Sequence, residues 1–311
     1  MSRKQPSDLA ASVRQRLLNL AKARGEELQL VLTRYGIERL LYRLGRTPAS
    51  EQFVLKGAVL FYVWEGEPHR PTRDVDFLGY GDSSPEAVAG VFRAVCEADV
   101  EPDGLTFLAE SVAAESIRDA QEYGGARLTL LAMLGNARIP LQVDVGFGDT
   151  VIPPAAVADF PTLLDFPAPR VRAYPAETVV AEKFQAMVAL GIANTRMKDF
   201  YDVWMLSETR RFEGARLAEA IAATFSRRGT ALPSADAPPL ALTEAFGRDA
   251  DKQRQWKAFL ARGGLSDAPT ELQTVLQRIA ALVMPPASAA RRGKEFHSIW
   301  ASGRDWTFEL R

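Results

Sequence analysis

The spacing of apolar residues in the first half of the chain changes from a helical to an extended period. From position 9 to about 45, apolar residues recur every three or four positions, which predicts two helices with a break near Gly25 or Gly36. Apolar runs and alternations then predict strands over 53–55, 74–78, 105–112, 126–134 and 139–145, with helices over 58–64 and 84–98. This order predicts a mixed sheet with flanking helices.

The second half of the chain has a different pattern. Prolines cluster between positions 153 and 169, where neither a regular helix nor a central strand is expected. We interpret that segment as a domain linker. Beyond it, helical spacing recurs over 176–190, 196–207, 214–225, 242–260 and 272–283. The pattern predicts an α+β domain over residues 1–165, including the N-terminal helices, and a mainly helical domain over 166–311.

Composition narrows the class of protein. The chain has 311 residues, 47% of them apolar, and a net charge of −1, so any nucleic-acid partner would need a local basic patch. A single cysteine, Cys96, excludes an intrachain disulfide and fits a reducing cytoplasm. No apolar segment has the length of a membrane span. We therefore expect a cytoplasmic protein with no membrane partner.

The most informative feature is a pair of acids, Asp74 and Asp76, on a predicted strand. Residues two apart in a strand share a face, so both carboxylates project together, about 7 Å apart along the strand. Without a counter-charge they would repel one another. A hard divalent cation relieves that repulsion, and Mg²⁺ keeps coordination positions for substrate phosphates. The spacing therefore suggests a metal site for phosphoryl or nucleotidyl transfer.

A third acid, Asp144, lies on the last predicted strand of this half. Alternation places it on one face with Gln142, opposite Val143 and Val145. On a neighbouring strand it would complete a three-acid cluster that can hold two cations. The ordinary alternative is an edge-strand aspartate that faces water.

Glycine and basic residues near the acids are candidate phosphate ligands. Gly57 follows a strand and opens a helix, where backbone N–H groups would face an anion, although a simple turn is the alternative. For Lys56, the alternative is an ordinary surface residue. Arg70 and Arg73 would either bind phosphate or neutralise the acids, and the sequence does not separate these two roles.

A second group of candidates lies on the predicted helices of the second half. Lys183 would supply a point charge to a triphosphate, or simply lie on a solvated face. Asp199 and Asp202 are three apart and share a helical face. They are either acids favoured near a helix N-terminus, or residues that orient Lys183 and contact the nucleotide.

Together these segments carry a family likeness. The runs that carry it are Phe53-Val54-Leu55-Lys56-Gly57-Ala58, Arg70-Pro71-Thr72-Arg73-Asp74-Val75-Asp76, Asp144-Val145-Gly146-Phe147-Gly148-Asp149, Ala181-Glu182-Lys183 and Arg196-Met197-Lys198-Asp199-Phe200-Tyr201-Asp202. In this order they resemble the AbiEii/AbiGii-type nucleotidyltransferase toxins, over roughly residues 9–233. The resemblance implies a DNA polymerase β-type nucleotidyltransferase fold with a helical C-terminal region, and a toxin of a toxin–antitoxin pair or a phage-defence protein.

The resemblance also implies roles for single residues. Asp74 and Asp76 match the paired metal-binding acids, Lys183 the lysine needed for activity, and Asp199 the acid that follows it. Gly57 matches the first residue of the family's Gly-Ser turn. Here Ala58 replaces the serine, which removes a hydroxyl that would hold a nucleotide phosphate.

The hypothesis is a nucleotidyltransferase that uses Mg²⁺, or Mn²⁺ in its place, and an NTP as substrate. The acceptor would be an RNA, with the 3′ end of tRNA the expected target, and an antitoxin protein would be the cognate partner. The rival hypotheses are a nucleotide- or antitoxin-binding protein with a residual site, and transfer of NMP to a protein hydroxyl. The expected catalytic residues are Asp74, Asp76, Asp144, Lys183 and Asp199, with all three strand acids as metal ligands. The expected nucleotide-binding residues are Gly57, Ala58, Arg73, Lys183, Lys198 and Asp202.

Basic residues elsewhere are candidate RNA contacts, because backbone phosphates attract lysine and arginine. Those on the N-terminal helices and toward the C-terminus are Arg14, Arg16, Lys22, Arg34, Arg39, Arg43, Arg227, Arg228, Arg291 and Arg292. For most of them we expect an ordinary solvated helix face instead.

Overall fold

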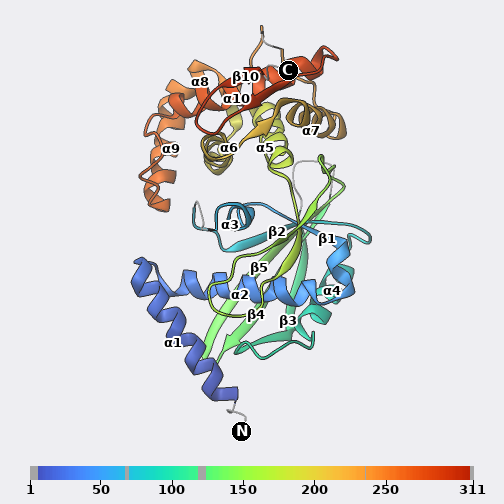
Figure 1. The fold of residues 1–311 in the computed structure, drawn as a ribbon, viewed down its shortest axis with the longest axis vertical. Helices are drawn as coiled ribbons and strands as arrows, with labels where there is room; N and C mark the ends of the chain where they lie inside the picture. Colours follow the sequence, from blue (N-terminus) through green and yellow to red (C-terminus); the bar gives the residue numbers. More distant parts are fainter. Residues whose placement is uncertain (1–5, 67–69, 118–123, 235, 309–311) are drawn as a thin grey trace. The chain divides into compact units, whose positions relative to one another are not determined.

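The computed structural model describes residues 6–66, 70–117, 124–234 and 236–308 (Figure 1). The chain divides into two compact units. The first comprises Met1–Gly148 and Ala156–Ala173, and the second Asp149–Ala155 and Tyr174–Arg311. Each unit is described by itself below. The predicted domain boundary at residue 165 stays a prediction.

Two helices open the first unit, α1 (Pro6–Arg24) and α2 (Leu28–Gly45), and they are separated at Gly25. Gly25 has φ 66°, a left-handed conformation that glycine adopts without steric cost. Gly36, the other predicted break, lies inside α2. A Cβ there would come within 3.1 Å of Ile139 and 3.2 Å of Leu141, so the missing side chain lets α2 lie close to the sheet.

The first unit is built on a seven-stranded mixed sheet with the order β3-β4-β5-β2-β1-β7-β6. Its strands are β1 (Phe53–Lys56), β2 (Asp74–Gly79), β3 (Leu105–Ile117), β4 (Gly125–Leu134), β5 (Ala137–Phe147), β6 (Ala156–Asp159) and β7 (Arg170–Ala173). The connecting elements are the 3₁₀ helix η1 (Pro48–Gln52), α3 (Leu60–Glu65) and α4 (Pro85–Cys96). β2 runs parallel to β5 and antiparallel to β1. The structure contains all five predicted strands and both predicted helices.

One face of this sheet is apolar and covered by helices. Val75 and Phe77 of β2 and Val143 of β5 are buried, and the Phe77 ring packs against Phe92 of α4. α2 packs on β5 and β7 and crosses the strands (Figure 1). The alternation of β5 therefore places Asp144 on the opposite face, as predicted.

We had expected the proline-rich segment to be a linker, but part of it belongs to the sheet. It contains the edge strand β6, which pairs antiparallel with β7 directly after the segment, and β7 pairs parallel with β1. The prolines lie outside the strands, and the pairing continues past them, because Phe160 N–H donates to Pro169 O at 2.8 Å. Prolines that flank short strands leave the hydrogen-bond ladder intact.

The second unit is mainly helical. Its helices are α5 (Ala176–Leu190), α6 (Met197–Thr209), α7 (Gly214–Arg227), α8 (Glu244–Arg248), α9 (Ala250–Gly263) and α10 (Leu272–Arg291), with 3₁₀ helices η2 (Gly191–Ala193) and η3 (Leu240–Leu242). A small sheet joins β8 (Phe212–Glu213), β9 (Ser298–Trp300) and β10 (Trp306–Phe308), which the sequence pattern did not predict. A mixed sheet with flanking helices, followed by a helical region, confirms the predicted fold class.

Two predicted helices of this unit have different bounds in the structure. The helix expected over 242–260 is interrupted at Asp249, whose carboxylate accepts from the N–H groups of Asp251 and Lys252 and so caps α9. α10 continues through Pro285 and Pro286 to Arg291. Burial of its apolar face against α6 and α7 offsets the cost of interior prolines.

Three arginines of α2 are buried, which contradicts the expected solvated face. Arg43 forms an ion pair with Asp103 at 2.6 Å, and the Arg39 guanidinium lies 4.3 Å from the centre of the Tyr42 ring. Arg34 is paired with Glu26 at 2.5 Å. These side chains therefore hold α2 in its unit. Across the described parts of the chain, no helix has the length and apolarity needed to cross a membrane.

Candidate functional site

Three carboxylates converge on the open face of the first unit's sheet, and we call Asp74, Asp76 and Asp144 the carboxylate cluster. β2 and β5 are parallel and in register, so that Asp76 lies directly beside Asp144 and Asp74 beside Gln142. Each of the three acids offers one oxygen within 4.8 Å of the others, and all three are half-buried. The strand spacing predicted that Asp74 and Asp76 share a face, and the register of β2 with β5, two strands far apart in sequence, brings Asp144 beside them.

Two acids of the carboxylate cluster are held by neighbouring side chains. The Thr72 hydroxyl donates to Asp74 Oδ1 at 2.6 Å. Arg127, opposite Asp144 on β4, donates from Nε to Oδ1 at 2.9 Å and from Nη2 to Oδ2 at 2.7 Å. These hydrogen bonds, with the charge of Asp144, raise the pKa of Arg127 above its ordinary value. The two-pronged contact fixes the plane of the Asp144 carboxylate.

Sequence reasoning missed Arg127. The only signal for it was its place on the strand that pairs with the Asp144 strand, and the register of that pair was not predictable from periodicity. Gln142 adds a weaker contact, with its amide nitrogen 3.3 Å from Asp144 Oδ1.

Gly57 lies against the carboxylate cluster. Its φ is 73°, and a Cβ built on it would come within 2.0 Å of Asp76 Oδ2. Only glycine therefore allows the β1–α3 turn to approach Asp76 this closely. α3, which follows the turn, has six residues, so its dipole is a smaller contribution to anion binding than the sequence argument assumed.

Lys56 shares the open face with the acids. It lies opposite Asp76 across the β1–β2 pair, and cross-strand partners project to the same side of a sheet. A Cβ at Gly146 would be 3.2 Å from Lys56 Nζ, so the ammonium group extends over the sheet as far as β5. We had weighed Lys56 as an ordinary surface residue, and the pairing of β1 with β2 makes it a candidate site residue instead.

Three other predicted nucleotide-binding residues lie in varied surroundings. Ala58 is buried at the start of the turn, 5% exposed. Arg73 is exposed and lies 3.7 Å from Glu27, in a pair that solvent screens. Lys198 is exposed on α6 in the second unit. Their roles stay predictions.

The second unit gathers a different set of charges, which we call the lysine cluster: Lys183, Arg196, Asp199 and Asp202. Lys183 Nζ of α5 lies 2.6 Å from Asp199 Oδ1 and 2.9 Å from Asp202 Oδ2. Arg196 Nε lies 2.7 Å from Asp199 Oδ2. Both aspartates are fully buried on one face of α6, whereas the lysine side chain is 14% exposed. The spacing of three had predicted that Asp199 and Asp202 share a face.

Next to the lysine cluster, Arg228 is engaged within the protein and is not an open RNA contact. It lies 2.9 Å from Asp149 and 3.4 Å from Glu182, the residue before Lys183. It also donates to Gln185 at 3.0 Å. Burial lowers the pKa of Arg228, but Glu182 and Asp149 together raise it above its ordinary value. Arg228 therefore ties α5 and α7 to the segment that follows β5.

A mixed sheet that gathers three carboxylates from neighbouring strands beside a glycine turn has the donor set of a nucleotidyltransferase. The comparison with protein families gives the same class. The model described as "Nucleotidyl transferase AbiEii toxin, Type IV TA system" matches residues 39–278. The chain belongs to this family of nucleotidyltransferase toxins of type IV toxin–antitoxin systems.

Two solved structures from Helicobacter pylori are similar to this chain. A structure titled as a putative nucleotidyltransferase has 16% sequence identity and a TM-score of 0.44, and the alignment covers 82% of this chain and 91% of that one. The structure titled JHP933 has 15% identity, a TM-score of 0.44, and coverage of 82% and 88%. At this distance the likeness adds nothing to the account of the site. No curated protein matches the sequence.

Proposed function

We propose that this chain transfers a nucleoside monophosphate from an NTP to the 3′ end of an RNA in the cytoplasm, with tRNA as the acceptor and Mg²⁺ as the metal ion. The observation that carries the proposal is the carboxylate cluster, whose three oxygens lie within 4.8 Å of one another on adjacent strands. Family membership supports the toxin role and a cognate antitoxin as partner.

The donor set fits a hard divalent ion. Mg²⁺ binds oxygen at 2.0–2.1 Å in an octahedron, so its ligand oxygens are about 3 Å apart when adjacent and about 4.2 Å apart when opposite, and these side chains would move inward to share one ion. Each carboxylate oxygen has two acceptor sites, so Asp144 can ligate an ion while it accepts from Arg127. Mn²⁺ accepts the same ligands. A bound ion would supply charge neutralisation at the α-phosphate.

The residues of the chain would then position the reactants. Asp74 and Asp76 on β2 would bind the metal ion, and the hydrogen bond from Thr72 fixes the Asp74 carboxylate. Asp144 either completes the ligand set or accepts the proton of the attacking 3′-hydroxyl, with Arg127 holding its plane. Gly57, and Lys56 beside it, face the phosphates. In-line attack at the α-phosphorus forms the new P–O bond and releases pyrophosphate, with positioning and charge stabilisation as the sources of rate.

Lys183 is proposed to bind a phosphate of the NTP. What supports this role is its surroundings, because two buried carboxylates hold the ammonium group in one orientation. Asp199 and Asp202 act as positioning residues for Lys183. Arg73, Ala58 and Lys198 are proposed as further nucleotide contacts.

The test is a labelling experiment. The full-length chain is incubated with each α-labelled NTP and Mg²⁺, and with total tRNA or a protein extract. We expect label in tRNA, none in tRNA whose 3′-terminal diol was oxidised with periodate, and none after addition of EDTA. Label in protein would instead identify a protein hydroxyl as the acceptor.

The matched variants are Asp76→Ala and Asp159→Asn. Asp159 is an exposed acid of β6 in the same unit, outside the carboxylate cluster. We expect Asp76→Ala to lose more than about a hundredfold in labelling rate, and Asp159→Asn to match the wild type. Full labelling by Asp76→Ala would refute the site assignment.

A further inference from the structure

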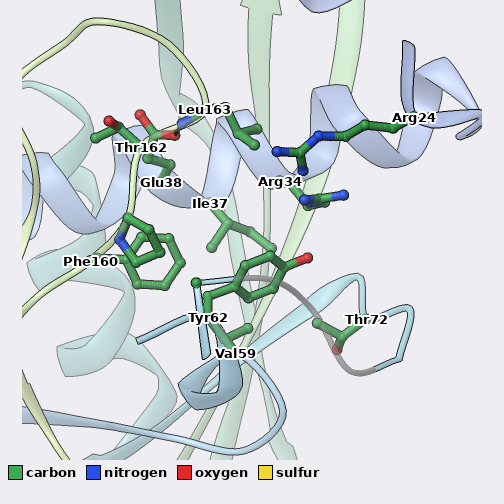
Figure 2. A pocket seen from close by; sticks show the side chains of 12 residues that line it. Arg24, Arg34, Ile37, Glu38, Val59, Tyr62, Thr72, Phe160, Thr162 and Leu163 are labelled. Carbon is green, nitrogen blue, oxygen red and sulfur yellow. Dashed lines mark hydrogen bonds between the residues drawn. The ribbon is translucent and has the colours of Figure 1, made fainter. Parts of the chain in front are cut away.

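The first unit has a pocket that the proposed reaction does not use (Figure 2). We call it the α2–α3 pocket, and its volume is about 100 Å³. α2, α3, the residues before β2 and the loop after β6 line it. Its apolar wall contains Ile37, Val59 and the Tyr62 ring, with Phe160 beside them.

The two ends of the α2–α3 pocket differ in charge. Arg24 and Arg34 lie at one end with Thr72, and the Tyr62 hydroxyl points toward this end in Figure 2. The Arg34 side chain is 4% exposed, its Nη1 pairs with Glu26 at 2.5 Å, and its guanidinium lies 5.1 Å from the centre of the Tyr62 ring. A guanidinium has five N–H donors, so an ion pair with one carboxylate does not by itself use them all. A buried arginine with a ring and hydroxyl groups beside it is suited to a phosphate oxygen.

The opposite end is acidic. Glu38 is 1% exposed and accepts from the Leu163 N–H at 2.7 Å and from Arg39 at 3.2 Å. Burial raises the pKa of Glu38 to about 7, against the hydrogen bonds from Leu163 and Arg39, which lower it. Near neutral pH this carboxyl group can therefore accept from a base N–H or, when protonated, donate to a base acceptor.

We propose that the α2–α3 pocket binds one nucleotide unit, with its base against the apolar wall and Glu38 and its phosphate at Arg24 and Arg34. The pocket, at about 100 Å³, is smaller than an engineered cavity of about 150 Å³ that encloses benzene in another protein, so it takes the edge of a base and not a whole nucleotide. The sugar and phosphate then lie toward the rim, where Arg24 is exposed.

The α2–α3 pocket is connected to the carboxylate cluster by one side chain. Thr72 lines the pocket and its hydroxyl donates to Asp74 at 2.6 Å. An occupant that contacts Thr72 would therefore influence the position of Asp74. The nucleotide unit has two sources, a free mononucleotide or a residue of an RNA strand, and the chemistry that binds it is the same for both.

The test measures binding, so it does not depend on transfer. The full-length chain is titrated by calorimetry in EDTA, which removes divalent ions from the carboxylate cluster, with AMP, CMP, GMP, UMP, inorganic phosphate and a short RNA. We expect saturable binding of at least one mononucleotide or of the RNA, and at least tenfold weaker binding of phosphate. Binding of mononucleotides identifies a free nucleotide as occupant, and binding of RNA alone identifies a strand.

Variants at the rim locate the binding without disturbing the core. Thr162 is exposed at the pocket, and Thr162→Trp would fill the entrance and is expected to weaken binding more than tenfold. Arg24→Gln is expected to weaken binding about fivefold, because a charged hydrogen bond to phosphate is lost at an exposed position. Arg14→Gln, an exposed arginine of α1 that does not line the pocket, is the control and should bind as the wild type does.

Three outcomes would overturn the proposal. They are no binding of any nucleotide or RNA in EDTA, wild-type affinity in both Thr162→Trp and Arg24→Gln, and phosphate binding as tight as nucleotide binding. If the nucleotide binds in EDTA and transfer is absent in the labelling experiment, the pocket stands and the transferase reaction does not.

Discussion

The carboxylate cluster and the lysine cluster both contain aspartate carboxylates, but they differ in burial and in the source of the neutralising charge. In the lysine cluster, Asp199 and Asp202 are fully buried, and Lys183 and Arg196 neutralise them within 3 Å. In the carboxylate cluster, three acids are half-exposed and lie close enough to share an ion. A buried acid must have its counter-charge in the fold, whereas a half-exposed group of acids can take it from solution. We infer that the first arrangement fixes a lysine and the second is suited to recruit a cation.

The largest effect that tests this comparison is on stability. Lys183→Met removes the ammonium group that pairs with two buried carboxylates, and we expect it to destabilise the second unit by about 3–5 kcal/mol. Asp76→Ala removes one of three clustered, half-exposed acids, so we expect it to change the free energy of unfolding by less than about 1 kcal/mol. Denaturant unfolding of both variants measures the difference.

Lys257→Met is the control for that pair. Lys257 is exposed on α9 and lies 3.7 Å from Glu271. Its loss should change the free energy of unfolding by less than about 0.5 kcal/mol. If Asp76→Ala were destabilised as much as Lys183→Met, the distinction between the two clusters would be wrong.

Glu38 adds a third case to the comparison. It is a buried acid whose charge Arg39 does not fully compensate, and the negative charge of Asp103 further raises its pKa. Its folded-state pKa of about 7 lies above the ordinary value of 4.5, so the folded chain binds this proton more tightly than the unfolded chain. The stability that Glu38 contributes is therefore complete below pH 4.5 and is lost as the pH rises through 7, by about 3 kcal/mol in total.

The measurement compares the wild type with Glu38→Gln, which does not titrate. We expect the wild type to lose stability relative to Glu38→Gln between pH 5 and pH 8, as followed by urea unfolding. A difference between the two proteins that stays constant over that range would show that Glu38 has an ordinary pKa.

Gly57→Ala tests how tightly the open cluster is packed. The added Cβ would displace the Asp76 carboxylate, and a misplacement of about 1 Å can cost about a hundredfold in rate. Gly25→Ala is the matched control, because Gly25 also has a positive φ, 66°, but no atom lies within 4 Å of the new Cβ. Both variants carry the cost of an alanine at positive φ, Gly57→Ala carries the clash with Asp76 in addition, and only Gly57→Ala should lose labelling activity.

Arg127→Gln is expected to have the smallest effect. Loss of the two-pronged contact frees the Asp144 carboxylate, and labelling should fall about tenfold. Removal of a positive charge should also lower the Mg²⁺ concentration that gives half-maximal labelling. Arg138→Gln, an exposed change on the same sheet, is the control. Weaker Mg²⁺ binding in Arg127→Gln would mean that Arg127 supports the ion and does not compete with it.

Much of the fold was predictable because it depends on local periodicity. The strands β1, β2, β4 and β5, and α5, α6 and α7 of the second unit, begin and end close to the predicted positions, whereas β3 continues past the predicted end at residue 112 to Ile117. Predictions failed where a long-range contact decided the outcome. β6 and β7 exist because β1 offers an edge to pair with, and α10 passes Pro285 because its apolar face is buried.

The residues of the candidate site also fall into those that local spacing predicts and those that only tertiary contacts bring together. The sequence by itself determined that Asp74 and Asp76 share a face, that Asp144 faces away from Val143, and that Asp199 and Asp202 are neighbours, since a strand repeats every two residues and a helix about every 3.6. Only the tertiary structure decided that Arg127 holds Asp144, that Lys56 reaches across to β5, and that Arg34 and Glu38 are buried at the α2–α3 pocket. Strand register and helix packing bring these residues together, and neither is encoded in the spacing of residues along one segment.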